Sequence, residues 1–391
     1  MHKINTLAYI IIKSATLRKE SRGLHYTTDY PHKNNQEIKR HPIMFENTGR
    51  TEIASLGEFG LIEHLCKNIT LHNSTTIKGV GDDAAIINHA AQQTVLSTDL
   101  LLEGVHFDLA YVPLKHLGYK SIMVNLSDIY AMNAKPTQAL VSLGFSSRFS
   151  LEAVEELYAG MLLACNKYGV DLVGGDTSSS KQGLVISVTA VGILPAGASA
   201  VQRDTAKIND LICVSGDLGA AYMGLQILER EKQVFLANPQ MQPELAGFDY
   251  IIERQLKPEA RKDLIDLLAE IEVLPTAMID VSDGLASELI HLSKSSKLGC
   301  TIYEEKIPID PVTINAARDF NLDPSMCALN GGEDYELLFT VSQSDFEKIK
   351  GQISFSIIGH MTDEASGTVM VSKNEKVYPL QAQGWNAFAG N

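Results

Sequence analysis

Acidic residues in short turns are the part of this sequence that could do chemistry. Two adjacent carboxylates, Asp82 and Asp83, follow glycines at positions 79 and 81 and precede an apolar run. Glycine permits φ > 0 and close backbone approach, so such a turn can hold carboxylates against a ligand. Neighbouring carboxylates repel each other unless a cation or hydrogen-bond donors lie between them. A single motif of this kind is also compatible with a solvated turn.

The arrangement recurs along the chain, each time with an Asp beside Ser, Thr or Gly at the edge of an apolar run. The recurrences are Ser97-Thr98-Asp99, Ser127-Asp128, Gly174-Gly175-Asp176 and Asp280-Val281-Ser282-Asp283. Hard oxygen ligands select Mg²⁺ or Mn²⁺, and several such ions could bridge a polyphosphate to an acidic protein. This chemistry indicates phosphoryl transfer. The candidate ligands are the carboxylates of Asp83, Asp99, Asp128, Asp176, Asp280 and Asp283, with the hydroxyls of Thr98 and Ser282.

Composition and missing motifs exclude several other classes. The chain has no Walker A pattern, no GxGxxG after a strand, no HExxH, no GxSxG and no Cys/His cluster. A net charge of −14 argues against attraction to nucleic acid or to an anionic membrane. No apolar run approaches the ~18 residues that a membrane span needs. The five widely spaced cysteines predict reduced thiols and a cytoplasmic protein.

Length and composition predict two domains after an N-terminal extension. The chain has 391 residues, more than a single hydrophobic core of about 250–300 residues accommodates. In residues 1–43, Lys and Arg outnumber Asp and Glu by eight to three, and we expect a flexible, dispensable extension before Met44, with a targeting segment as the alternative. The small, uncharged stretch 195–200 is the best linker, which places an N-terminal domain at 44–195 and a C-terminal domain at 201–391.

Strand and helix patterns alternate in both halves, which predicts an α/β or α+β fold with mixed sheets flanked by helices. Helices are expected over 56–66, 117–131, 151–169 and 257–271 and from about 285, and strands over 94–98, 140–145, 184–194, 211–215 and 276–281. Asp176 is expected in a glycine turn that ends a short strand. Ser121, Asn125 and Asp128 form a polar stripe on the first long helix, and we expect this face to be turned into a site.

The motifs GVGDDAAII, STDLLLEGVHF, VNLSDIYAMNA, VGGDTS, AMIDVSDGLASEL and NGGEDYELLF, in this order and spacing, resemble those of thiamine-monophosphate kinases. That family belongs to the superfamily of aminoimidazole ribonucleotide synthetase and selenophosphate synthetase. The resemblance covers residues 56–388 and implies the two-domain fold of that superfamily, with homodimers whose N-terminal domains form a joined β-structure. It also implies direct in-line transfer of the ATP γ-phosphoryl to thiamine monophosphate, with several Mg²⁺ ions.

The resemblance assigns roles to individual positions. Metal ligands would be Asp83, Ser97, Thr98, Asp99, Asp128, Asp176, Asp280 and Asp283, and catalysis would run through the metals bound by Asp99, Asp128 and Asp176 without a covalent nucleophile. Gly175, Asp176, Arg203 and Ser282 would contact ATP. His106, Glu333 and Trp385 would contact thiamine monophosphate. Each of the last three has a structural alternative: a satisfied strand histidine, a helix cap and C-terminal core packing.

Two rival functions stay open at this point. The first is another ATP-using synthetase of the same superfamily, and the second is a non-catalytic nucleotide- or metal-binding relative. Selenophosphate synthetase would need a reactive Cys or Sec near a Lys in an N-terminal Gly-rich loop, and none of the five cysteines is placed in that way. The chain departs from the family where Arg203-Asp204-Thr205 replaces the usual Arg-Ser-Gly, which puts the local backbone at this ATP contact in question.

Overall fold

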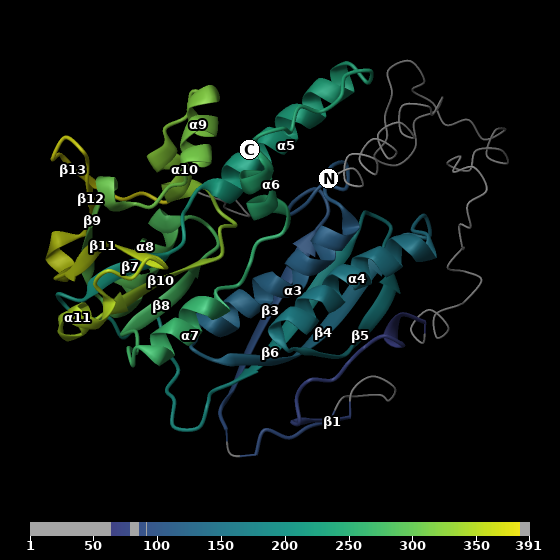
Figure 1. Ribbon diagram of the computed structural model, residues 1–391, viewed down its shortest axis with the longest axis horizontal. Helices are drawn as coiled ribbons and strands as arrows, with labels where there is room; N and C mark the ends of the chain where they lie inside the picture. The colour runs from purple at the N-terminus through teal and green to yellow at the C-terminus, as the bar shows by residue number, and fades with distance from the viewer. Residues whose placement is uncertain (1–63, 79–85, 91, 384–391) are drawn as a thin grey trace.

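The computed structural model describes residues 64–78, 86–90 and 92–383 (Figure 1). The predictions for the extension 1–43, for Asp83 and for Trp385 therefore lie outside the described residues. Most of the predicted helix over 56–66 lies there too, and its last three residues are helical.

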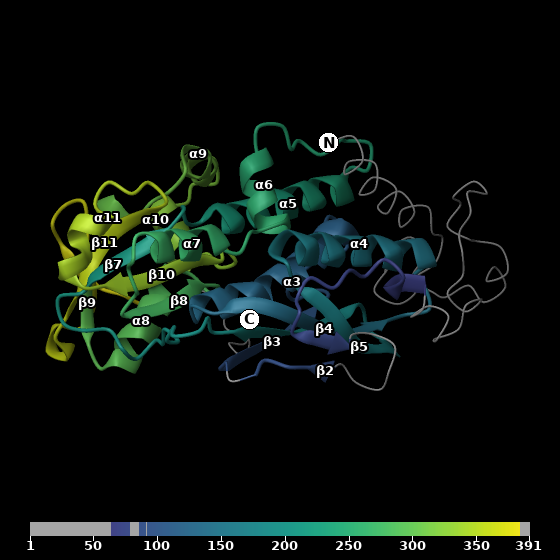
Figure 2. The same ribbon diagram turned by 60° about the horizontal axis from the view of Figure 1, so that its bottom comes forward.

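A four-stranded mixed sheet forms the first half of the described chain. Its strands stand in the order β3-β6-β4-β5, with β4 and β5 parallel and the other neighbours antiparallel. The bounds are Thr94–Leu102 for β3, Lys135–Phe145 for β4, Asp171–Ser179 for β5 and Val185–Ile193 for β6. A short antiparallel pair, β1 (Thr76–Lys78) and β2 (Ile86–Ile87), precedes it. Both α3 (Leu114–Ala131) and α4 (Leu151–Tyr168) lie on one face of the sheet (Figures 1 and 2).

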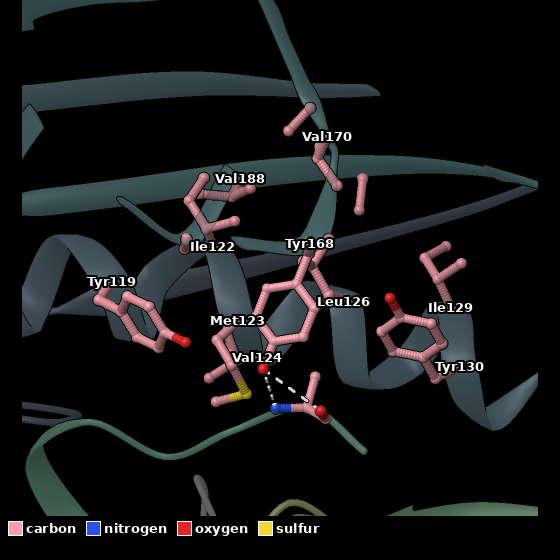
Figure 3. Close-up of a cluster of buried hydrophobic side chains, with 14 of the residues drawn as sticks. Tyr119, Ile122, Met123, Val124, Leu126, Ile129, Tyr130, Tyr168, Val170 and Val188 are labelled. Atoms are coloured by element: carbon pink, nitrogen blue, oxygen red, sulfur yellow. Dashed lines mark hydrogen bonds between the residues drawn. The ribbon is translucent and has the colours of Figure 1, made fainter. Parts of the chain in front are cut away.

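Helix α3 is buried on nearly every side because it lies between the sheet, α4 and the second half of the chain. Gly118 of α3 and Gly160 of α4 let the two helices approach until an added Cβ would meet a backbone oxygen of the other helix at 1.9 Å. The apolar side chains of α3 pack against β6 and the end of α4 (Figure 3). There the Tyr168 hydroxyl accepts from the Ala260 N–H at 3.0 Å and donates to its carbonyl at 3.3 Å. These two bonds link α4 to the second half of the chain.

A seven-stranded mixed sheet forms the second half, in the order β13-β12-β9-β11-β7-β10-β8. Its strands are β7 (Leu211–Ser215), β8 (Ala277–Val281), β9 (Gly299–Tyr303), β10 (Glu336–Val341), β11 (Phe355–Thr362), β12 (Thr368–Val371) and β13 (Val377–Pro379). The helices are α5 (Ala220–Ala237), α6 (Asp249–Leu256), α7 (Lys262–Glu270), α8 (Leu285–Ser296), α9 (Pro311–Asp319), α10 (Pro324–Asn330) and α11 (Phe346–Ile349), with short 3₁₀ turns η2 (Glu304–Lys306), η3 (Gln343–Asp345) and η4 (Glu364–Ser366). Pairing of β12 with β9 is parallel and the rest is antiparallel.

Strand β10 shows why helices cover both faces of this sheet. Successive side chains of a strand point to opposite faces, and all six residues of β10 are buried. Leu337 and Phe339 join the core that includes α7, whereas Leu338 joins the core that includes α8. A continuous apolar run is the pattern expected of such a doubly covered strand. The mixed α/β architecture with two sheets confirms the predicted fold class.

Three local predictions need correction. Asp176 lies inside β5 rather than in a glycine turn after it. Helix α7 begins at Lys262, five residues later than the predicted start at Lys257, and the separate helix α6 before it was not predicted. Pro258 explains the break, because the residue before a proline is driven away from the helical region. Strand β3 also continues through Asp99 to Leu102.

No helix or strand is assigned between the end of β6 at Ile193 and the start of β7 at Leu211. The domain boundary at residues 195–200 stays a prediction. Among the described residues, no helix combines the length and the apolar character that crossing a membrane requires.

Candidate functional site

Strand β3 and helix α3 bring three of the predicted ligands together. Ser97 and Asp99 are two residues apart on β3, so their side chains share a face of the sheet, and this face is turned toward α3. The Ser97 hydroxyl donates to the Asp128 carboxylate. The Asn125 amide oxygen accepts from the Asp99 N–H at 3.0 Å. The polar stripe of α3 is therefore turned inward, as predicted, and it fixes the strand that carries Asp99.

Asp280 joins this group from the second half of the chain. It lies in β8, is buried, and accepts from the Ser127 hydroxyl at 2.8 Å. Ser127 and Asp128 are neighbours on α3, so one turn of this helix contacts both β3 and β8. We call Asp99, Asp128 and Asp280 the carboxylate cluster.

The carboxylate cluster lacks enough positive charge of its own. Burial, followed by the charge of Asp128, raises the pKa of Asp99 to about 6. Burial and the Asp128 charge also raise the pKa of Asp280, and burial raises that of Asp128 despite its bond from Ser97. Arg203 opposes the shifts of Asp128 and Asp280, which places its charge near both. A cation bound here would favour the charged carboxylates and so oppose the effects of burial and of the Asp128 charge that raise these pKa values.

The loop after β8 extends the acidic region. Asp283 lies just before the N-terminus of α8, and its backbone N–H donates at 2.9 Å to the buried carboxylate of Glu288. Burial raises the pKa of Asp283 and raises that of Glu288 to about 8. The Ser282 carbonyl accepts from the Glu333 N–H at 2.7 Å, so this loop also touches a predicted substrate contact.

His106 and Glu333 lie near each other around the buried Lys120. The Lys120 ammonium is 3.0 Å from the Glu333 carboxylate. Nδ1 of His106 accepts a hydrogen bond from the Leu102 N–H at 3.0 Å, so the neutral ring carries its proton on Nε2. Burial lowers the pKa of His106, with the Glu333 charge raising it and the Lys120 charge lowering it. This side of the site thus has a neutral donor, a cation and an anion.

Three predicted residues stand apart from the carboxylate cluster within one chain. The Thr98 hydroxyl points to the other face of β3, where it donates to the Val188 carbonyl at 3.0 Å. Gly175 and Asp176 lie on β5, at the opposite edge of the sheet from β3. Asp99 and Gly175 lie in one row across the four strands. Three inter-strand spacings separate their backbones, a distance of about 14 Å.

Gly175 belongs to a strand for a packing reason. A Cβ at this position would lie 1.7 Å from the Val141 carbonyl oxygen of β4, so only glycine allows β5 to pass this closely. The double glycine was interpreted as a turn signal, and the sequence pattern does not distinguish the two uses. Asp176 is exposed beside it.

In the described ranges, 64–78, 86–90 and 92–383, no three acidic, His or Cys side chains converge closely enough to form a ready-made metal centre. The carboxylate cluster nevertheless fits a hard divalent cation, because it offers partly desolvated oxygen ligands, and among the described residues Arg203 is the counter-charge that acts on Asp128 and Asp280. Asp83, the remaining predicted ligand, lies outside the described residues.

A second charged region lies beside a cavity of about 460 Å³ that none of the predicted site residues lines. Arg254 of α6 contacts Glu336 at 2.8 Å, and Arg261 bonds the other carboxylate oxygen of the same residue. Arg254 also lies 3.8 Å from the buried Asp334. We call these four residues the arginine cluster. The Glu336 carboxylate thus carries two direct guanidinium partners, whereas the Asp334 carboxylate accepts from the Gly219 and Ala221 N–H groups.

The structure adds three residues that the sequence reasoning did not assign to the site. Lys120 and Gln255 both donate to the Glu333 carboxylate, and Glu288 holds the Asp283 backbone. From Lys120 to the end of α3, the only charged residues are Lys120 and Asp128. An isolated charge on an otherwise apolar stretch is the signal that could have identified Lys120. Gln255 had no such signal, because its helix was not predicted.

Comparison with known proteins first defines the class. Residues 81–194 match the family model for AIR synthase related protein, N-terminal domain. The fold resembles a solved structure described as AaThiL complexed with AMPPCP and TMP, with TM-score 0.65, 33% identity, and coverage of 88% of this chain and 100% of that one. It also resembles thiamine-monophosphate kinase from Stenotrophomonas maltophilia K279a, with TM-score 0.68, 32% identity, and coverage of 82% and 97%. The family model and the fold thus define the class as AIR-synthase-related.

Thiamine-monophosphate kinase of Bacillus subtilis (strain 168) is 34% identical over 340 residues, which are 85% of this chain and 100% of that protein. The chain belongs to the thiamine-monophosphate kinase family. A second family model, fumarate reductase flavoprotein C-term, matches residues 1–75. That match spans a small part of the chain, and most of it lies outside the described residues.

Proposed function

We propose that this enzyme transfers the γ-phosphoryl group of ATP to thiamine monophosphate and releases ADP and thiamine diphosphate. The observation that carries the proposal is the carboxylate cluster, which α3 assembles from both halves of a chain of this family. A solved relative binds an ATP analogue, AMPPCP, together with TMP. The test is an assay of thiamine diphosphate formed from ATP, Mg²⁺ and thiamine monophosphate. Nucleotide binding without turnover would favour a non-catalytic relative.

Mg²⁺ is the proposed cofactor, in several ions. Asp99, Asp128 and Asp280 would hold ions with Ser97, and Asp83, Thr98, Asp176 and Asp283 would complete the ligand set. When bound, these ions neutralise charge on the polyphosphate and on the transferred group. Ser127 and Asn125 orient the ligands from α3, since one bonds Asp280 and the other the Asp99 backbone.

The residues of this chain position the two substrates for direct in-line transfer. Arg203 lies near Asp128 and Asp280 and would contact ATP together with Ser282 and Gly175. His106 would donate from Nε2 to the acceptor phosphate, and Glu333 would contact the acceptor, with Trp385 as a further contact. His106 is the only histidine in a matched motif, and its role as a donor leaves no nucleophile for a phosphorylated enzyme. Incubation with γ-labelled ATP alone should leave no label on the protein that thiamine monophosphate can chase into product.

A homodimer would resolve the separation of Asp176 from the carboxylate cluster. Strands β3 and β5 are the two edges of the four-stranded sheet, and edge strands present unpaired backbone groups. Leu96 and Leu100 on β3 are 67% and 51% exposed on the face away from α3. A second copy with β5 beside β3 would cover them and bring Asp176 of the partner subunit toward Asp99.

Mixing two inactive variants tests this shared site. Asp99→Asn and Asp176→Asn should each be inactive. Co-unfolded and refolded together, they should regain about a quarter of the wild-type rate, since half the dimers are mixed and each mixed dimer has one intact site. No recovery in demonstrably mixed dimers, or a monomer by light scattering, would refute the shared site.

A cytoplasmic location is also proposed. The buried cysteines Cys165, Cys213, Cys300 and Cys327 form no disulfide bonds, which supports it.

A further inference from the structure

Lys120 is a buried cation that the proposed chemistry leaves without a role. Its side chain is 5% exposed. Its ammonium donates to the Gln255 carbonyl at 2.9 Å and to Oε2 of Glu333 at 3.0 Å. An ammonium taken out of water is costly unless it is paired. The sequence therefore places a charge on α3 that is matched to a carboxylate in the other half of the chain.

The Glu333 carboxylate is held by one of its two oxygens. Oε2 accepts from Lys120 and also from the Gln255 amide at 2.7 Å. Neither of these bonds uses Oε1. The Glu333 side chain is 27% exposed, whereas its two donors are buried. The two buried donors thus anchor Oε2 of a carboxylate that is partly exposed.

The backbone of Glu333 is also held in a fixed and uncommon conformation. Its φ is +67°, in the left-handed region that residues with a Cβ seldom adopt. Its N–H bonds the Ser282 carbonyl, and two residues later the Tyr335 N–H bonds the Val281 carbonyl at 2.9 Å. Such strain persists only where the surroundings over-determine it, and it concentrates at functional sites. Side chain and backbone together preorganise this carboxylate.

We propose that Lys120, assisted by Gln255, is a positioning residue that orients Glu333 toward the acceptor substrate. The inference rests on the proposed function, because the acceptor is taken to be thiamine monophosphate. That molecule carries a cationic thiazolium ring and an aminopyrimidine, and an oriented carboxylate oxygen recognises either group. Lys120 acts through Glu333, so its removal should change acceptor binding and leave ATP binding unchanged.

A double-mutant cycle separates positioning from general stability. The variants are Lys120→Met, Glu333→Gln and the double variant, with KM for each substrate and kcat measured on the full chain. Lys120→Met should raise the KM for thiamine monophosphate about 10–100-fold, the range for a lost charged hydrogen bond, with KM for ATP within about twofold. The double variant should be no worse than Glu333→Gln alone, because the two residues act as one unit.

Two further variants keep the test decisive. Lys115→Met removes an exposed lysine of the same helix and should match wild type. If Lys120→Met does not fold, Gln255→Leu removes the second donor and should raise the same KM about threefold or more with ATP unaffected.

The failures are distinguishable. Wild-type protein that does not phosphorylate thiamine monophosphate would refute the proposed function, and with it the acceptor role of Glu333. If the wild-type protein is active, and the KM increases of the two single variants multiply in the double variant, only the positioning role is refuted. Equal effects on the KM values of ATP and of thiamine monophosphate would refute it as well.

Discussion

The carboxylate cluster and the arginine cluster are both partly or fully buried groups that contain acids, but they differ in the source of their counter-charge. Glu336 in the arginine cluster is bonded by two guanidinium groups of the same chain. Asp128 and Asp280 each accept from a serine hydroxyl, and Arg203 lowers the pKa values of these two residues without forming an ion pair with either in the described part of the chain. Burying a charge is costly unless it is paired. The difference shows which acids the chain neutralises itself and which require a cation from solution.

The comparison predicts opposite outcomes for substitutions in the two clusters. Neutralising an acid in the carboxylate cluster should remove activity without loss of fold, because it relieves repulsion in the metal-free protein. Neutralising Glu336 in the arginine cluster should destabilise the fold, because Glu336 is the carboxylate that Arg254 and Arg261 share.

The largest effect is expected for Asp128→Asn. Turnover should fall about a thousandfold or more, since a neutral amide is a poor Mg²⁺ ligand and cannot offset phosphate charge. The melting temperature without metal should stay level or rise. The exposed Asp319→Asn on α9 is the matched control and should behave as wild type. A wild-type rate for Asp128→Asn at saturating Mg²⁺ would show that this residue is not a ligand.

Glu336→Gln is expected to cost about 3–5 kcal/mol of the free energy of unfolding, as for other buried ion pairs that lose one partner. Urea denaturation measures it. The control is Glu347→Gln, which breaks the exposed ion pair with Lys350 and should cost less than about 1 kcal/mol. Equal losses in the two variants would contradict the contrast between the clusters.

The sequence predicted the acids of one cluster and none of the pairing in the other. The Asp-rich motifs include Asp99, Asp128 and Asp280, since an Asp beside Ser or Thr at the edge of an apolar run is visible locally, but they also include Asp176, which lies apart within one chain. The arginine cluster was missed because Arg254 lies on α6, which was not predicted, and its partner Glu336 is 82 residues away. Local patterns report helices and strands, whereas pairing of distant charges is decided by the tertiary fold.

The glycines at 174 and 175 show a second limit. Their pattern is the same in a turn and in a strand that passes close to a neighbour. Only the register of β5 on β4, with Gly175 opposite Val141, decides between the two. The mixed α/β class was predicted correctly because alternation of strand and helix is a property of the chain itself.

His106→Ala extends the comparison to the acceptor side, where the donor is neutral. Loss of the Nε2–H should raise the KM for thiamine monophosphate and so lower kcat/KM. The lost transition-state stabilisation should be about 2–3 kcal/mol, and ATP binding should be retained. Initial-rate kinetics with each substrate varied measures this. An unchanged KM for the acceptor, or lost ATP binding, would contradict the assignment.

The pH dependence of stability sharpens the comparison further. Asp99 has a pKa of about 6 in the metal-free fold against an ordinary value of 3.8, so the folded state binds more protons between these values. Stability should therefore fall as pH rises from about 4 to about 6. Burial also raises the pKa values of Asp334 and Glu288, to about 7 and about 8, with the same sign.

The measurement for Asp99 is thus a difference between proteins. Melting temperatures of metal-free wild type and Asp99→Asn are compared at pH 5 and pH 7.5. The decrease should be smaller in the variant, and Mg²⁺ should reduce it in wild type only. The same decrease in both proteins would show that the Asp99 charge is not a source of the instability.

The smallest effect is expected for removal of residues 1–43, which carry none of the residues of either cluster. Every contact of the carboxylate cluster described above involves residues from Ser97 onward, so the truncated protein should keep its melting temperature and its turnover. The match of residues 1–75 to a second family model makes this test informative, since the deletion removes 43 of those positions. An insoluble product, or a rate at least about tenfold lower, would show that the extension contributes to the fold or to the site.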